Sequence, residues 1–418
     1  MGMTITEKIL ARASGHEQVH AGEIVQARVD KVMMDDILGP RVQIAEHLER
    51  LNAPIWNSER VTVISDHYTP PANARQAEIV KFTREWAARH NIRYYEFAGP
   101  CHQVMVEKGR VLPGEVVLGT DSHTCTYGAL GVFSTGIGST EMLGVLCTGE
   151  IWLKVPETMH FRLNGKLQNG VMAKDVALHC IGTIGHNGAT YKAMEFSGDG
   201  VSDMGMDERL CIANMAVESG AKNGIFAPDD ITRSYMESLG IHEGMYFRSD
   251  DDASFCRGIN VDLTAMEPLC ACPHEVDNTA RMDDVSSVRI NQAYIGSCTG
   301  GRYNDLKKAA DLLRGHHIAQ GVRLLISPAS REIWERCARD GILTSLSEAG
   351  ATILASSCGA CLGLHSGAIS AGEVCVSSTN RNFLGRMGSK DSQVYLASPL
   401  SVAASAITGR LTDPREFL

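Results

Sequence analysis

The sequence has no excess of basic residues. Its 418 residues include 39 lysines and arginines against 49 aspartates and glutamates, so the formal net charge at pH 7 is −10. A nucleic-acid-binding protein needs a basic surface that displaces counterions from the phosphates. The composition therefore counts against general binding of nucleic acid.

Long apolar runs are missing as well. No stretch approaches the roughly 18 consecutive apolar residues of a membrane-spanning helix, and the start, MGMTITEKILARASG, lacks the apolar core of a signal peptide. We therefore expect a cytoplasmic protein with no membrane partner. In that compartment the 13 cysteines are not expected to form disulfides. Most should pack as small apolar side chains, which leaves a few free to bind a metal.

Short apolar runs that end in small polar residues recur along the chain. They are VTVIS (61–65), VVLG (116–119), NQAYIG (291–296), ATILAS (351–356) and VCVSS (374–378). This pattern is typical of buried parallel strands, and helical stretches such as 74–90 and 303–314 lie between them. The alternation predicts an α/β protein whose ligands bind at the carboxyl ends of the strands. Breaks near 155–167 and 268–284 divide the chain into three expected domains, 1–156, 157–283 and 284–418.

Three cysteines follow such strands. Cys358 and Cys361 lie in SSCGACLG, and Cys298 lies in GSCTGG. Three thiolates at strand ends suit an iron–sulfur cluster with one corner left open, whereas a cluster used for electron transfer normally takes four cysteines. A zinc site and ordinary buried thiols remain alternatives at this point.

Histidines and carboxylates occupy other strand-end loops. Asp66 and His67 follow one strand, Asp121, Ser122 and His123 follow another, and His102 lies after AGPC. Asn214 and Glu218 are four residues apart, which predicts that they share one face of a helix. A carboxylate next to an imidazole fixes its tautomer and raises its pKa, as acid–base catalysis requires. Any one such pair is more often structural, but several on strand-end loops favour a catalytic site.

The segment TNRNFLGR contains Asn380, Arg381 and Arg386. An arginine binds a carboxylate through two parallel hydrogen bonds, so two arginines near the thiols suit a dicarboxylic substrate. The simpler interpretation is a pair of surface arginines.

These motifs together identify a resemblance. GTDSHTCTYGALGVFSTGIGSTE (119–141), GSCTGG, SSCGACLG and STNRNFLGR resemble the aconitase superfamily, and within it the large subunits of isopropylmalate dehydratase and homoaconitase-like enzymes. The resemblance implies three α/β/α domains around a [4Fe-4S] cluster held by Cys298, Cys358 and Cys361, with one iron open to substrate. It pairs Asp66 with His67, Asp121 with His102, and Glu218 with His123, and it makes His67 the acid that protonates the leaving hydroxyl. It places the remaining motif residues near the cluster or the substrate: Ser122, Asn214, Asn380, Arg381 and Arg386.

The superfamily's fourth, swivelling domain carries a serine base within a serine–arginine motif. ASREIW (329–334) contains similar letters, but it lies in the expected third domain and in a helical context. We therefore expect a large subunit that lacks the swivel domain and takes the catalytic serine from a small-subunit partner.

The expected activity is reversible dehydration of a 2-hydroxy dicarboxylic acid, with 3-isopropylmalate in leucine biosynthesis as the first candidate. In MMDDILGP (33–40), however, Leu38 and Gly39 stand where the family usually has hydroxyl residues. That departure keeps 2,3-dimethylmalate and homoaconitate as alternative substrates. Two other classes were weighed, a cluster-free RNA-binding protein and a zinc hydrolase that uses the CxxC pair.

Overall fold

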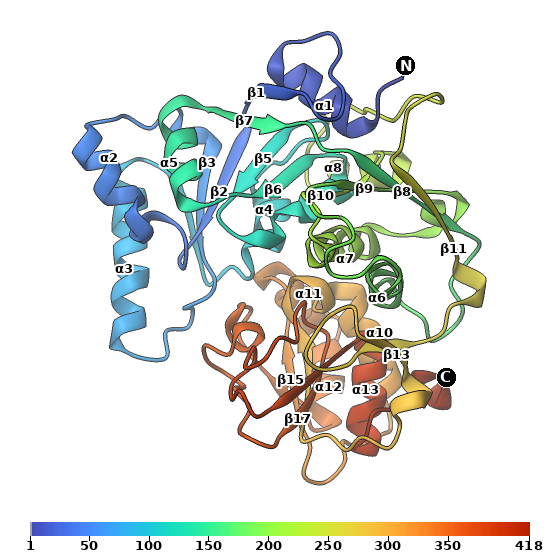
Figure 1. Ribbon diagram of the computed structural model, residues 1–418. Coiled ribbons are helices and arrows are strands. Elements are labelled where there is room, and N and C mark those ends of the chain that lie inside the picture. The colour runs from blue at the N-terminus through green and yellow to red at the C-terminus, as the bar shows by residue number, and fades with distance from the viewer. Residues whose placement is uncertain (1) are drawn as a thin grey trace.

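The computed structural model describes residues 2–418, which form three mainly parallel sheets flanked by helices (Figure 1). The first sheet is entirely parallel, with strand order β4-β3-β2-β5-β6. Its strands are β2 (Lys31–Asp35), β3 (Val61–Ser65), β4 (Arg93–Glu96), β5 (Val116–Gly119) and β6 (Phe133–Gly136). The helices of this part are α1 (Ile5–Ser14), α2 (Ala45–Leu51), α3 (Ala74–Arg89), α4 (Cys101–Lys108) and α5 (Ser139–Thr148). A separate antiparallel ribbon pairs β1 (Ile24–Arg28) with β7 (Glu150–Lys154).

The second sheet has the parallel order β10-β9-β8-β11. Its strands are β8 (Thr158–Asn164), β9 (Ala193–Ser197), β10 (Asn223–Phe226) and β11 (Arg257–Asp262). The helices of this part are α6 (Ala173–Ile184), α7 (Met206–Met215) and α8 (Asp230–Ser238). In Figure 1 this green part lies beside the first sheet and above the C-terminal part, and α6 and α7 face the latter.

The third sheet has the order β13-β12-β18-β17-β14-β15-β16. Five of its strands are parallel, namely β14 (Gln292–Gly296), β15 (Arg323–Ser327), β16 (Thr352–Ile353), β17 (Val374–Ser377) and β18 (Gln393–Ala397). Two short antiparallel strands, β12 (Leu269–Ala271) and β13 (Thr279–Arg281), extend it beyond β18. The helices here are α9 (Ser297–Gly300), α10 (Tyr303–Leu313), α11 (Arg331–Arg339), α12 (Ile342–Glu348) and α13 (Pro399–Thr408).

The strands expected from the sequence appear at the expected places, with one difference in length. VTVIS and VVLG are β3 and β5, whereas ATILAS contributes only the two residues of β16. The third sheet also takes up β12 and β13, which precede the expected start of the third domain at residue 284. Those strands cover the edge of β18 that would otherwise be open. The division into domains 1–156, 157–283 and 284–418 stays a prediction.

A shared apolar core joins the three parts. One cluster of buried side chains includes Val104 from α4, Phe161 from β8 and Leu396 from β18, and each of these is fully buried. The three sheets are therefore packed against one another, and the loops at their edges are held in fixed positions relative to each other.

The sheet topology creates two places where ligands are expected. In the first sheet β2 lies between β3 and β5, and in the third sheet β14 lies between β15 and β17. In the first sheet the chain adds β3 and β4 on one side of β2 and then β5 and β6 on the other side. In the third sheet it adds β15 and β16 on one side of β14 and then β17 and β18 on the other. In open α/β sheets the crevice at such a switch point is the usual binding site.

Candidate functional site

A cavity of about 420 Å³ opens at both switch points. Its walls are loops that follow strands of the first and third sheets. Twelve of the predicted site residues line it: Asp66, His67, His102, Asp121, Ser122, His123, Cys298, Cys358, Cys361, Asn380, Arg381 and Arg386. The other two, Asn214 and Glu218, stand behind this lining and contact it.

The three predicted thiols lie on one side of the cavity. Cys298 is in the short helix α9, directly after β14, and Cys361 is in a 3-10 turn, Gly359–Leu362, that begins after Cys358. The Cys358 backbone N–H donates to the Asp66 carbonyl oxygen at 3.0 Å, which ties this loop to the end of β3. A hydrogen bond from the Cys358 thiol lowers the pKa of Cys361 well below its usual range.

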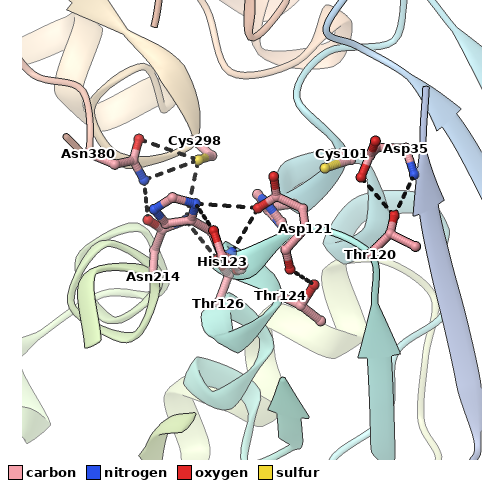
Figure 2. Close-up of polar contacts among 12 residues, drawn as sticks. Asp35, Cys101, Thr120, Asp121, His123, Thr124, Thr126, Asn214, Cys298 and Asn380 are labelled. Carbon is pink, nitrogen blue, oxygen red and sulfur yellow. Dashed lines mark hydrogen bonds and ion pairs between the residues drawn. The ribbon is translucent and has the colours of Figure 1, made fainter. Parts of the chain in front are cut away.

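Two asparagines, Asn214 and Asn380, face the sulfur of Cys298 (Figure 2). The Asn214 side-chain N–H lies 3.3 Å from Cys298 Sγ, and Asn380 Oδ1 lies 3.9 Å from Cys298 Sγ and 3.8 Å from Cys361 Sγ. Asn380 Nδ2 also donates to Asn214 Oδ1. Three converging thiols with amide donors around them are a donor set that fits an iron–sulfur group at three corners, with its fourth side toward the cavity. A fourth lining thiol, Cys101, lies next to Asp35, across the view of Figure 2 from Cys298.

His67 is buried between two carboxylates. Its Nδ1 lies 2.7 Å from Asp66 Oδ1 and 3.3 Å from Asp36 Oδ1, as ion-pair contacts. Burial alone would lower the pKa of His67, but the charge of Asp66 and the contacts with both carboxylates raise it well above its usual value. His67 is therefore held as the imidazolium, with Nε2 4.0 Å from Asp121 Oδ2. Such a group can donate a proton into the cavity.

The other two acid–histidine pairs also lie in contact. His102 Nε2 is 2.8 Å from Asp121 Oδ1, and His123 Nε2 is 2.7 Å from Glu218 Oε1. Burial opposes ionisation of Glu218, but hydrogen bonding to His123 and the charge of Arg381 lower its pKa below the ordinary value. Glu218 therefore remains a carboxylate that orients both partners.

One local prediction is wrong. Asn214 and Glu218 were expected on one face of a single helix, but α7 ends at Met215 and Glu218 lies in the following 3-10 turn, Ala216–Ser219. The Gly220 that closes this turn has φ +80°, a conformation that suits glycine. Asn214 nevertheless contacts Cys298, and Glu218 in the 3-10 turn contacts His123.

Two arginines border the cavity with different contacts. Arg381 donates from Nε to both Glu218 carboxylate oxygens, at 2.9 and 3.0 Å, and no described residue accepts a hydrogen bond from its two Nη nitrogens. Arg386 donates from Nε to the Cys361 carbonyl oxygen at 2.9 Å, which leaves Nη2 3.9 Å from Cys361 Sγ. Ser122 Oγ lies 3.4 Å from His123 Nδ1. Arg381 therefore presents free donors suited to a carboxylate.

The structure adds two carboxylates that the sequence analysis did not select. Asp36 accepts the backbone N–H groups of His67 and Tyr68, at 3.1 and 3.0 Å, in addition to its contact with the His67 ring. Asp35 ends β2 and lines the cavity, and burial raises its pKa to about 6. The Thr120 hydroxyl donates to Asp35 Oδ2 at 2.7 Å across the switch point of the first sheet. Asp35 and Asp36 come at the end of the apolar run in MMDD. The pattern that selected Asp66 and Asp121, polar residues directly after a short apolar run, was therefore present there too.

One part of the cavity wall is apolar. Four aliphatic side chains line it: Ile37, Leu38, Ile137 and Leu362. They come from loops that follow β2, β6 and Cys361. The cavity therefore offers charged groups near the thiols and an aliphatic surface for a hydrocarbon group.

Fold and site together define an α/β protein with three mainly parallel sheets and a cavity lined by thiols, histidines, carboxylates and arginines. The chain matches the Aconitase family (aconitate hydratase) over residues 7–289 and 279–409. This chain belongs to that family, which consists of iron–sulfur enzymes.

Individual relatives are similar over their whole length. The chain is 46% identical over 421 residues to 3-isopropylmalate dehydratase large subunit 1 of Methanopyrus kandleri, covering 100% of both chains. It is 45% identical over 420 residues to the 3-isopropylmalate dehydratase large subunit of Acetivibrio thermocellus, again covering 100% of both. Among solved structures, Thermococcus kodakaraensis aconitase X in its holo-form has a TM-score of 0.52 at 13% identity, over 87% of this chain and 85% of that one. That likeness supports an aconitase-like fold.

Among residues 2–418, none of the helices combines the length and the apolar character that a bilayer crossing requires.

Proposed function

We propose that this chain is the large subunit of a hydro-lyase that dehydrates a 2-hydroxy dicarboxylate, with 3-isopropylmalate as substrate and leucine biosynthesis as its pathway. The observation that carries the proposal is one cavity of about 420 Å³ that brings together three thiols, three acid–histidine pairs and two arginines. The full-length similarity to large subunits of 3-isopropylmalate dehydratase supports the choice of substrate.

Cys298, Cys358 and Cys361 hold a [4Fe-4S] cluster in this proposal. When bound, the cluster would supply Lewis-acid chemistry for the hydroxyl and a carboxylate of the substrate. Asn214 and Asn380 donate to Cys298 Sγ and orient that cysteine. Three thiols also argue against a zinc hydrolase, because catalytic zinc usually takes histidine and carboxylate ligands.

His67 donates the proton that lets the hydroxyl leave as water. The paired carboxylates Asp66 and Asp36 keep it charged and fix the orientation of its ring. The pairs His102–Asp121 and His123–Glu218 hold the side chains of the neighbouring wall in place. Asp121 contacts all three histidines, so it couples their positions.

Arg381 binds one substrate carboxylate through its free Nη donors, with Ser122 and Arg386 beside it. The substrate's alkyl group then lies against the apolar wall formed by Ile37, Leu38, Ile137 and Leu362. An isopropyl group gains free energy there by leaving water, whereas the third carboxylate of homoaconitate would lose its hydration without an ionic partner. The wall therefore favours 3-isopropylmalate over homoaconitate, and 2,3-dimethylmalate, with smaller alkyl groups, is the closer competitor.

The base that removes the carbon-bound proton comes from a small subunit that carries the swivel domain. Among the described residues, the cavity lining contains a single serine, Ser122, and its hydroxyl is already close to His123. The name "large subunit" of the relatives supports such a partner. In this proposal the large and the small subunit work together in the cytoplasm.

The direct test combines the chain, reconstituted anaerobically with iron and sulfide, with its candidate small subunit. Hydration of isopropylmaleate, dimethylmaleate and cis-homoaconitate is then measured side by side. We expect turnover of isopropylmaleate that needs both subunits, slower turnover of dimethylmaleate and little of cis-homoaconitate. Zinc without iron in the purified chain, together with no turnover of any substrate, would overturn the proposal.

Arg381→Lys should weaken substrate binding. A lysine ammonium can still pair with Glu218, but it cannot offer the parallel N–H groups that bind a carboxylate through two bonds. We expect KM for isopropylmalate to rise about tenfold, with a smaller change in kcat. Steady-state kinetics of the two-subunit enzyme measures this, and the exposed Arg331→Lys is the matched control. Unchanged KM and kcat would remove Arg381 from the substrate site.

A further inference from the structure

Lys174 is a buried lysine whose ammonium group has no carboxylate partner within ion-pair distance among residues 2–418. Its side chain is 1% exposed, and it lies in the first turn of α6. The partial positive charge at a helix N-terminus is an unfavourable place for a cation. A buried cation without a carboxylate partner normally destabilises a protein, so its presence calls for a reason.

The contacts of Lys174 lead to the two asparagines at the thiols. Its Nζ donates to the Thr379 carbonyl oxygen at 2.6 Å and lies 3.5 Å from Met215 Sδ. Thr379 is the residue before Asn380, and Met215 is the residue after Asn214. The Lys174 ammonium group thus contacts the residue next to Asn380, in the third sheet's part of the chain. It also contacts the residue next to Asn214, in the second sheet's part.

The same loop is held from its other side. The Asn382 side-chain amide donates to the Cys272 carbonyl oxygen at 2.8 Å, and the Leu269 N–H donates to Asp175 Oδ1 at 2.9 Å. Lys174 and Asp175 are consecutive residues. The start of α6 therefore anchors both the segment 379–381 and the strand β12 that supports its continuation.

The electrostatic surroundings point in the same direction. Burial lowers the pKa of Lys174, and the nearby groups Cys211, Glu218, Cys361 and Cys298 raise it. Two of these four groups are thiols of the proposed cluster, and a third, Glu218, is in the acid–histidine network. Lys174 therefore lies within electrostatic range of the site.

We propose that Lys174 is a positioning residue that places a buried positive charge behind the anionic group at Cys298, Cys358 and Cys361 and holds the segment Thr379–Arg381 through its hydrogen bond. The inference rests on the proposed function only for the identity of that anionic group. Lys174 neutralises part of the cluster's negative charge, and it fixes the register of Asn380 and Arg381 against Asn214.

The test uses the full chain reconstituted with iron and sulfide. Lys174→Met keeps an unbranched side chain only one atom shorter and removes the charge, and Lys174→Gln also removes the charge while retaining an N–H donor. Lys81→Met, at a lysine with a 68% exposed side chain on α3, is the matched control. Loss of iron to a chelator, the reduction midpoint potential of the cluster and the thermal midpoint of the cluster-free chain are measured for each.

We expect both Lys174 variants to lose iron about tenfold faster than the wild type, as removal of a supporting group around a metal site typically does. Their midpoint potentials should shift to more negative values, because a nearby positive charge favours the reduced cluster. The cluster-free variants should melt within a few degrees of the wild type, since replacing a buried charge by an apolar group is often neutral or stabilising. Lys81→Met should match the wild type throughout.

Wild-type iron retention and potential in both Lys174 variants would overturn the proposal. Failure of the cluster-free variants to fold would also contradict it, because Lys174 would then be structural. None of these measurements needs a substrate. An absence of isopropylmaleate turnover by the wild type would therefore count against the proposed function. The role of Lys174 could still be decided from iron retention and midpoint potential.

Discussion

Cys358→Ser is expected to abolish cluster assembly and all hydro-lyase activity. The substitution exchanges a soft thiolate for a hydroxyl that stays protonated at neutral pH and binds iron poorly. Cys358 lies at the start of the turn that presents Cys361, and its backbone N–H is bonded to the Asp66 carbonyl oxygen, so no other thiol can take its place without moving this loop. Iron and sulfide per chain after anaerobic reconstitution, and turnover with the small subunit, are the measurements.

A matched control separates loss of a ligand from loss of a buried thiol. Cys375 is fully buried in β17 of the same sheet and does not line the cavity, so Cys375→Ser should keep its iron and sulfide. Cys101→Ser is the sharper comparison, because Cys101 lines the same cavity but is not one of the three proposed ligands. Full iron content in Cys358→Ser, or equal loss in Cys375→Ser, would contradict the assignment of the three ligands.

The sequence alone predicted the strand ends well, because each strand is a short buried run followed by small polar residues. β3 and β5 lie at the predicted positions, and the residues after them line the cavity. The run ATILAS was less predictable. Only two of its residues form β16, since the chain leaves the sheet early to carry Cys358 toward Asp66. That early exit depends on a contact between the first and third sheets, which no local pattern contains.

The chemistry of the site was only partly readable from residue spacing. The spacing of Cys298, Cys358 and Cys361 left zinc and iron–sulfur binding open, and the three acid–histidine pairings came from the resemblance to the aconitase superfamily. Asp36 was not selected, although it contacts the same ring as Asp66. Its role depends on β2 lying next to β3, which is a matter of strand order and not of sequence distance.

The position of Lys174 in the site could not be predicted from a sequence motif. It lies 205 residues from its partner Thr379, and the hydrogen bond forms only because α6 packs against the third sheet's loops. In the sequence the stretch VMAKDVAL reads as an ordinary helix start, with the lysine expected on the surface. Buried groups that join separate sheets are therefore the class of site residue that sequence patterns miss most readily.

His67→Asn is expected to reduce kcat by about 10²- to 10⁴-fold while the cluster is retained. Asparagine approximates the size of the first part of the imidazole ring but carries no transferable proton, so the leaving hydroxyl must depart without its acid. The three cysteines contact neither ring nitrogen of His67 in the described structure, and iron and sulfide content should therefore match the wild type. KM should change little, because the carboxylate-binding donors of Arg381 are unaffected.

The comparison that decides this prediction is with His160→Asn. His160 is also buried, at 8% exposed, but it lies on β8 and its Nε2 contacts Ser197 Oγ at 2.6 Å, away from the cavity lining. If burial of a histidine were what mattered, both variants would lose stability and activity together. If His67 is the acid, only His67→Asn loses kcat, and its iron and sulfide content stays at the wild-type level. A wild-type rate for His67→Asn in the presence of the small subunit would place the acid elsewhere, and His102, 2.8 Å from Asp121, would be the next residue to substitute.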